Sequence, residues 1–196
     1  MNRWQLPNGQ IVVTDMPFSY NGIQYPANWI RLSSSADRAA LGMVELPDPP
    51  QVDERFYYVN SDGTVTQKPM PVCRNVIKTQ LASVRWSHES EGIIYNNAVF
   101  ATDEQSRVNY IGALLQAQNN PGYTTVWKAK TDSDPSDTVF VTLDANSLSY
   151  ITGSGIDYIS KCFVNEESIR VQIDSSLDLN ELLAIDLESG WPTRQY

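Results

Sequence analysis

Few residues in this 196-residue chain have side chains that could do chemistry, and they are widely separated. The only histidine, His88, lies in the run Trp86–Gly92. A catalytic histidine needs a nucleophile within hydrogen-bond reach and a group that orients its ring. The sequence has no Gly-x-Ser-x-Gly turn that would present a serine nucleophile. Because His88 falls near the end of an expected helix, where the helix dipole favours a cation, we expect a structural role.

Three carboxylates within six residues form the second candidate site: Asp132, Asp134 and Asp137. Calcium takes several oxygen ligands, so an acidic loop could hold a cation. This loop lacks the glycine and the bidentate glutamate of an EF-hand, and Pro135 stiffens it. We interpret it as a solvated hairpin tip and keep an opportunistic cation site as the alternative.

The remaining chemical patterns are weak. Gly153-Ser154-Gly155 is too short to cradle a phosphate and is not followed by Gly-Lys-Ser/Thr. Cys73 and Cys162 stand far apart and have neither disulfide nor metal-ligand spacing, so both are expected to be free thiols. The C-terminal carboxylates are spread along an expected helix and fit its solvated face. We therefore expect no catalytic, cofactor-binding or metal-binding residue, and no enzyme activity.

Composition narrows the classes of partner. Fourteen Lys and Arg against twenty-three Asp and Glu give a net charge of −9. Such a chain is unsuited to the phosphate backbone of nucleic acids, since that affinity comes largely from Lys and Arg. No stretch approaches the length of about 18 apolar residues that spans a bilayer. Residues 1–9 lack the basic-then-apolar pattern of a secretory signal, so synthesis in a cytoplasm is expected.

The expected fold class is α+β, with a small β-rich N-terminal domain at residues 1–70. Asn21-Gly22 is a strong hairpin signal between two alternating segments, and Ser61-Asp62-Gly63 indicates a second hairpin. Ser34 or Ser35 is expected to cap a single helical turn. The domain boundary is placed at residues 68–71, since two prolines one residue apart are not expected inside a helix.

Residues 71–196 are expected to form an α+β domain in which hairpins and strands pack with three or four helices. Thr102 is the expected N-cap of one helix and Asp144 opens the last long one. Gly153-Ser154-Gly155 favours a bend or break in that helix, because each glycine costs about 1 kcal/mol there. The expected elements are a helix at 72–88, a hairpin at 93–100, a helix at 102–118, strands at 123–129 and 138–143, and helices from 144 and from 177.

Two groups of side chains are candidates for an interface. Aromatic residues concentrate near the N-terminus, among them Tyr25 and Trp29, and suggest a docking surface; filling a small β core is the alternative. The long C-terminal helix carries an apolar stripe at helical spacing. That stripe could mediate self-association or pack on the domain's own strands, and it comprises Leu148, Ile151, Ile159, Phe163, Ile169 and Ile173.

Two stretches of the chain resemble proteins of tailed bacteriophages. The run Tyr25-Pro26-Ala27-Asn28-Trp29-Ile30-Arg31-Leu32, followed by residues 39–43 and Pro47-Asp48-Pro49-Pro50, is similar to a segment of tail-fibre and tail-fibre assembly proteins. Residues 74–159, with the hairpin 92–107, resemble an uncharacterised domain common near the C-termini of phage tail and baseplate proteins. These motifs are packing and turn patterns, and the resembled family has no assigned active site.

The resemblance implies a structural component of a phage tail, near the fibres or baseplate, located in the virion after synthesis in the host cytoplasm. Its partners would then be other tail proteins. A homo-oligomer is expected, because tail parts repeat around symmetry axes, and a trimer if the protein sits on a fibre. The alternative is a tail-fibre assembly chaperone that acts transiently. An enzyme acting on host-surface polysaccharide is a third class, which only the scattered carboxylates favour.

Overall fold

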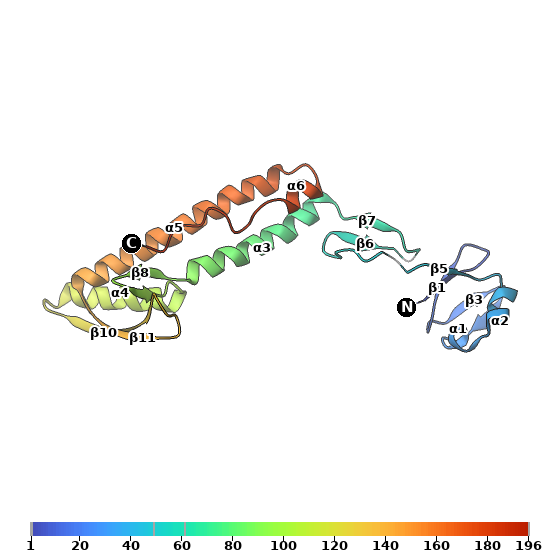
Figure 1. Cartoon of the computed structure of the whole chain (residues 1–196), viewed down its shortest axis with the longest axis horizontal. Coiled ribbons are helices and arrows are strands. Elements are labelled where there is room, and N and C mark those ends of the chain that lie inside the picture. Colours follow the sequence, from blue (N-terminus) through green and yellow to red (C-terminus); the bar gives the residue numbers. More distant parts are fainter. Residues whose placement is uncertain (1, 49, 61, 196) are drawn as a thin grey trace. The chain divides into compact units, whose positions relative to one another are not determined.

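The computed structural model describes residues 2–48, 50–60 and 62–195. Two residues named above, Pro49 of the proline run and Ser61 of the second hairpin, lie outside this described part. Helices and antiparallel strands are both present (Figure 1), and the expected α+β class is confirmed. The chain separates into two compact units, Met1–Cys73 and Arg74–Tyr196.

The first unit consists of short strands and two short helices. Its strands are β1 (Arg3–Gln5), β2 (Ile11–Val13), β3 (Phe18–Tyr20), β4 (Ile23–Tyr25), β5 (Val44–Leu46), β6 (Tyr57–Val59) and β7 (Val65–Gln67), and its helices are α1 (Trp29–Leu32) and α2 (Ser35–Ala40). Strands β2, β1 and β5 form one antiparallel sheet in that order, and β3–β4 and β6–β7 are separate hairpins. A small core lies among these elements: Leu6, Val12, Phe18, Ile30 and Met43.

Local turn chemistry explains several of these elements. Asn21 and Gly22 both have positive φ, 49° and 78°, which suits the tight turn between β3 and β4. Ser34 is the N-cap of α2 and forms a capping box with Asp37. Gly42 follows α2 with φ of 66°, the left-handed conformation that commonly ends a helix.

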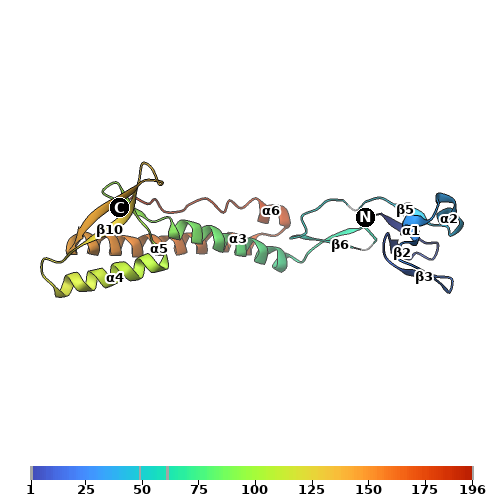
Figure 2. The same cartoon turned by 90° about the horizontal axis from the view of Figure 1, so that it is seen from below.

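The second unit is dominated by three long helices. Its elements are α3 (Met70–Ser90), which begins in the first unit, β8 (Ile93–Tyr95), β9 (Ala98–Phe100), α4 (Glu104–Asn119), β10 (Thr124–Thr131), β11 (Thr138–Asp144), α5 (Ala145–Ser175) and α6 (Leu179–Leu183). The strands form one antiparallel sheet in the order β11-β10-β9-β8. Helix α4 packs beside α5 (Figure 2).

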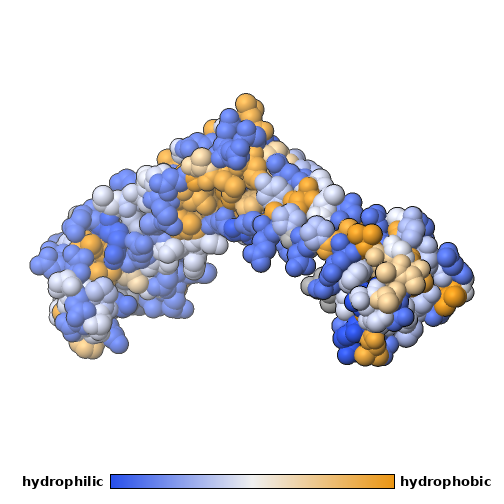
Figure 3. Space-filling view, turned by 45° about the vertical axis from the view of Figure 1, so that its right-hand side comes forward, coloured by the Kyte–Doolittle hydropathy of each residue, from blue (hydrophilic) through white to orange (hydrophobic). Residues whose placement is uncertain are grey.

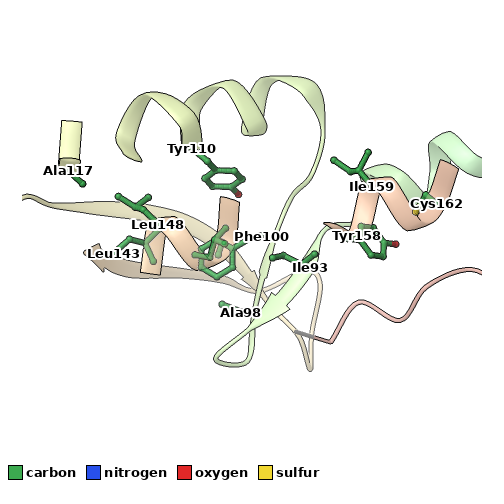
Figure 4. Packing of buried hydrophobic residues seen from close by; sticks show 12 residues of the cluster. Ile93, Ala98, Phe100, Tyr110, Ala117, Leu143, Leu148, Tyr158, Ile159 and Cys162 are labelled. Atoms are coloured by element: carbon green, nitrogen blue, oxygen red, sulfur yellow. The ribbon is translucent and has the colours of Figure 1, made fainter. Parts of the chain in front are cut away.

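The core of the second unit lies between the sheet, α4 and the N-terminal half of α5 (Figure 4). Phe100 from β9 and Tyr110 from α4 meet edge to face, with their ring centroids 6.4 Å apart. The stripe of α5 supplies Leu148, Ile151 and Ile159 to the same cluster. Alternate residues of β10 and β11 also face it, as expected for half-buried strands.

The prolines near residue 70 do not exclude a helix. Pro71 lies in the first turn of α3, where its missing N–H has no intrahelical partner to lose. The carbonyl of Pro69 accepts from the N–H of Cys73, 3.2 Å away, which opens the helical hydrogen-bond pattern. The expectation that Pro69 and Pro71 both stand outside a helix was therefore wrong for Pro71.

Thr102 does not cap α4. The N-cap is Asp103, whose Oδ1 accepts from the N–H of Ser106 at 3.0 Å. Hydrogen bonds from Ser106 lower the pKa of Asp103 below its usual value, so the cap stays charged. Thr102 is instead buried, donating its hydroxyl to the carbonyl of Glu89 and accepting from the N–H of Gly92 at 3.1 Å. It joins the end of α3 to the start of β8.

Replacing Thr102 by valine is expected to destabilise the protein by about 2 kcal/mol, because the buried carbonyl and N–H that the hydroxyl joins would both lose a partner. Val and Thr have nearly the same shape, so the loss reports the hydrogen bonds. Urea unfolding of the Thr102→Val variant measures it. If stability is unchanged, the hydroxyl does not join α3 to β8.

Helix α5 runs unbroken through Gly153 and Gly155, so a break there, one of the two expected outcomes, was wrong. Gly155 is buried, and a Cβ at this position would lie 3.5 Å from Cγ2 of Thr102. This is an ordinary van der Waals distance, so α5 packs against the segment that precedes α4 at this point. Tertiary packing thus compensates for the low helix propensity of glycine.

Candidate functional site

The feature of the second unit that most resembles a binding site is an apolar groove between α4 and α5. The groove has a volume of about 330 Å³. Buried core residues form its floor and exposed residues its rim, and its lining is Ile93, Phe100, Thr102, Glu104, Arg107, Val108, Tyr110, Ile111, Ile151, Thr152, Gly155 and Ile156. A concave and mostly apolar surface of this kind is typical of sites that receive a ligand or a partner's side chains.

Large apolar side chains at and next to the groove stay about half exposed in the described part of the chain. Val108 and Ile111 of α4 and Ile156 of α5 line the groove, and Leu115 follows Ile111 on α4 four residues further on. These four side chains are between 47% and 59% exposed. We call them the open apolar face. Contiguous exposed apolar surface usually marks an interaction site, whereas scattered exposed residues do not.

The apolar residues Val108, Ile111, Leu114 and Leu115 recur at helical spacing in the sequence of α4. The structure buries Tyr110 and Ala117 on the side of α4 that faces the sheet, where Leu114 also packs on the core, and it leaves Val108, Ile111 and Leu115 exposed. Tyr110 packs against Trp127 of β10, with the ring centroids 4.7 Å apart. Two apolar stripes on one helix signal a second interface, and this signal was present in the sequence.

Ionic contacts next to the groove fix the three long helices to one another. Glu89 of α3 is almost fully buried and pairs with Arg85 of the same helix and with Arg107 of α4, whose Nη1 lies 3.4 Å from Glu89 Oε1. Arg85 Nε also lies 3.1 Å from Oε2 of Glu166 on α5. The guanidinium of Arg85 stacks over the ring of Phe163 at 4.7 Å. This network therefore sets the position of α4 relative to α5, and with it the shape of the groove.

The stripe on α5 is mostly interior. Leu148, Ile159 and Ile169, proposed from the sequence as interface residues, are buried in the second unit, and so are Ile151 and Ile173. These side chains pack inside their own chain. This packing was expected from the sequence as the alternative to self-association. Phe163 alone is exposed, to 49%, with Arg85 against one face of its ring.

The two N-terminal candidates, Tyr25 and Trp29, form an aromatic cluster with Phe18. Tyr25 stacks on Phe18 with centroids 4.7 Å apart, and Trp29 meets Tyr25 edge to face at 5.0 Å. Both are half-buried and pack on the core of the first unit. They help to build that core, and each leaves part of its ring at the surface.

His88 sits between two carboxylates and an aromatic ring. Its Nε2 lies 3.0 Å from Glu188 and its Nδ1 3.4 Å from Glu91. The imidazole stacks on Trp191, with centroids 4.8 Å apart. Among the described residues no serine or cysteine is bonded to the ring, and its contacts hold the segment that follows α6 against the end of α3.

The other chemical candidates are dispersed. Cys73 and Cys162 are buried free thiols. Burial raises the pKa of Cys162 to about 11, so this thiol stays protonated at neutral pH. In the acidic loop Asp134 accepts from Ser136 and Asp137 from the N–H of Thr138. Among the described residues no group of three or more His, Cys, Asp or Glu side chains is placed to hold a metal ion.

Exposed apolar residues also occur at the turn between α5 and α6, where Leu177 is 81% exposed. Figure 3 shows that apolar surface gathers in several places on the face that it presents. No helix in the part of the chain that the structure describes is long and apolar enough to cross a membrane.

The second unit is thus an α+β domain in which two long helices leave an apolar groove open. Residues 73–188, more than half of the chain, match the model of a domain of unknown function, DUF4376. The chain belongs to this family. Neither the curated proteins nor the solved structures gave a match.

Proposed function

We propose that this protein is a structural component of a bacteriophage tail, associated with the fibres or baseplate, and that it acts by attachment to neighbouring tail proteins. The observation that carries the proposal is the open apolar face of the DUF4376 domain. The resemblance of residues 25–50 and 74–159 to tail proteins supplies the context. In this proposal the protein works in the virion after synthesis in the host cytoplasm, as a homo-oligomer, and needs no cofactor or catalytic residue.

The energetics of the open apolar face suit attachment. Full burial of a Val, Leu or Ile side chain contributes about 1.5–3 kcal/mol. Each of the four side chains is already about half covered, so a partner gains about 1 kcal/mol from each by this measure. The groove beside them can also receive a partner's side chain, as the pockets around interface hot spots do.

The ionic network makes the open apolar face a fixed surface. Arg85, Glu89 and Arg107 hold α3 to α4, and Glu166 extends the network to α5. A surface whose geometry is set before binding loses less conformational entropy when the partner arrives. A part that must be built into an assembly in one orientation benefits from that rigidity.

Ile156→Lys tests the proposal directly. The side chain is exposed, so lysine is expected to leave the fold intact and to reduce incorporation into virions at least tenfold, because a charge would be buried at the contact. Quantitative mass spectrometry of purified virions measures incorporation, with thermal unfolding of the same variant. Val164→Lys is the matched control, since Val164 is exposed on the same helix and does not line the groove. Wild-type protein found in lysates and never in virions would contradict the proposal.

A tail-fibre assembly chaperone is the second candidate. The segment at residues 25–50 favours it, because its resemblance extends to assembly proteins, and a net charge of −9 can keep a bound folding partner soluble. Co-expression with a tail fibre separates the two functions. A chaperone raises the yield of soluble fibre and then dissociates, whereas a tail component stays bound.

A further inference from the structure

The two edge strands of the four-stranded sheet differ in whether other backbone groups pair with their outer side. At the β8 edge, the N–H of Ile94 donates to the carbonyl of Arg194 at 2.8 Å, and Ile94 forms a parallel bridge with Gln195. Arg194 also donates to the carbonyl of Gly92 at 2.9 Å. The chain's own C-terminal segment therefore covers this edge. At the other edge β11 pairs with β10 alone.

The direction of the free backbone groups of β11 follows from the hydrogen bonds at the end of the ladder. The N–H of Thr131 donates to the carbonyl of Asp137, and that of Asp132 donates across to Asn97. Residues that face each other in an antiparallel pair alternate between bonded and non-bonded pairs. Counting along the register from residues 131 and 137, the backbone groups of Phe140 and Thr142 point away from β10.

Within the described part of the chain, no group bonds to the outward backbone of Phe140 or Thr142. The neighbouring N–H, that of Thr138, is already taken by the carboxylate of Asp137 at 2.8 Å. Natural proteins usually protect such an edge with lysine, proline or a bulge inside the strand. The sequence of β11, Thr138–Asp144, contains none of these.

We propose that β11 pairs antiparallel with β11 of a second copy of this chain, about a two-fold axis that passes beside Val141. In this register the strands overlap over their full length, and Phe140 of each copy exchanges both backbone hydrogen bonds with Thr142 of the other. The two sheets join into one continuous sheet. This dimer does not depend on the proposed role in a phage tail.

The side chains of the outward face are complementary in this register. Phe140 is 69% exposed and Val126, opposite Thr142 on β10, is 65% exposed. The ring of Phe140 lies directly opposite the small Thr142 of the second copy and can cover it, and Val126 of that copy follows in the same row on its β10. The register also places opposite charges, Lys130 and Asp144 of the second copy, in one row of the sheet. Lys130 stands opposite Thr138 on β10, and the pairing brings the Asp144 of the second copy beside that threonine.

Sedimentation velocity of the full chain tests the dimer, with Thr142→Pro as the main variant. Proline is tolerated in an edge strand where its nitrogen faces outward, so the β10–β11 ladder is expected to remain while pairing with the second copy is lost. The wild type is expected to sediment as a dimer at micromolar concentration and the proline variant as a monomer. Thr142→Val, which keeps the N–H, is the control and is expected to remain a dimer.

A second pair of variants covers the case in which the proline variant fails to fold. Lys130→Glu is expected to weaken the dimer about fivefold, because it replaces a lysine by a carboxylate in the same row as Asp144 of the second copy at both symmetric ends, whereas Lys128→Glu, whose row holds no carboxylate, leaves it unchanged. A wild type that is monomeric at micromolar concentration overturns the proposal. So does a folded Thr142→Pro variant that remains a dimer, or equal effects of the two lysine variants.

Discussion

Glu89→Ala is expected to lower the free energy of unfolding by about 3 kcal/mol, since breaking a buried ion pair leaves its partner's charge uncompensated. The carboxylate of Glu89 has a side-chain exposure of only 5%, and two arginines face it. Without it, Arg85 keeps one partner, Glu166, and Arg107 loses its own. The helical circular dichroism signal during urea unfolding measures the change.

Glu167→Ala is the control for that measurement. Glu167 lies on α5 beside Glu166, carries the same charge and is exposed. Its replacement is expected to change stability by no more than about 0.5 kcal/mol. A Glu89→Ala variant that is as stable as Glu167→Ala would show that the network does not hold α3, α4 and α5 together.

Gly92→Ala is expected to destabilise the protein by about 3 kcal/mol, whereas Gly153→Ala is expected to stabilise it by up to about 1 kcal/mol. Gly92 has φ of 88°, and a Cβ there would lie 2.5 Å from the carbonyl oxygen of Phe100. Gly153 stands inside the continuous helix α5, where a Cβ would meet nothing within 4 Å. The same chemical change thus has opposite signs at the two positions.

Differential scanning calorimetry of both glycine variants measures these effects. The Gly153→Ala result also tests the continuity of α5, because a bend at this position would remove the advantage of alanine. A loss of stability in Gly153→Ala would mean that the helix is interrupted there. An unchanged melting temperature in Gly92→Ala would mean that the turn from α3 to β8 adapts to a side chain.

Features set by neighbouring residues could be predicted from the sequence. The hairpin expected at residues 93–100 is present, and Asn96 and Asn97 in its turn both adopt positive φ, 50° and 62°, which asparagine tolerates. Asp144 accepts from the N–H of Ser147 and caps α5, as expected. In both cases the interaction that decides the conformation lies within three residues along the chain.

Features decided by distant residues could not be predicted in the same way. Thr102 and Asp103 are both good N-cap residues, and the choice between them depends on Glu89 and Gly92, which engage the threonine hydroxyl. The glycines of α5 reduce helix propensity, but packing near Thr102 compensates. Neither contact can be predicted from neighbouring residues, because each joins residues that are far apart in the sequence.

The open apolar face could not be predicted from the sequence either. The spacing of Val108, Ile111 and Leu115 indicates a stripe on α4 but does not say what the stripe faces. The core on the other side of α4 is built around Tyr110 and Ala117, a weaker signal in the sequence. Only the placement of Trp127 and the sheet decides which stripe is interior.

The closure of the β8 edge by residues 194–195 has a consequence for the order in which the domain matures. Arg194 follows its partner Gly92 by 102 residues. At the usual rate of synthesis, about 5–20 residues per second, the ribosome needs about 5–20 s to make the intervening chain. During that interval β8 has its hairpin partner β9 but an uncovered outer edge. The nascent domain is therefore more open to mispairing with other chains until residues 194–195 emerge.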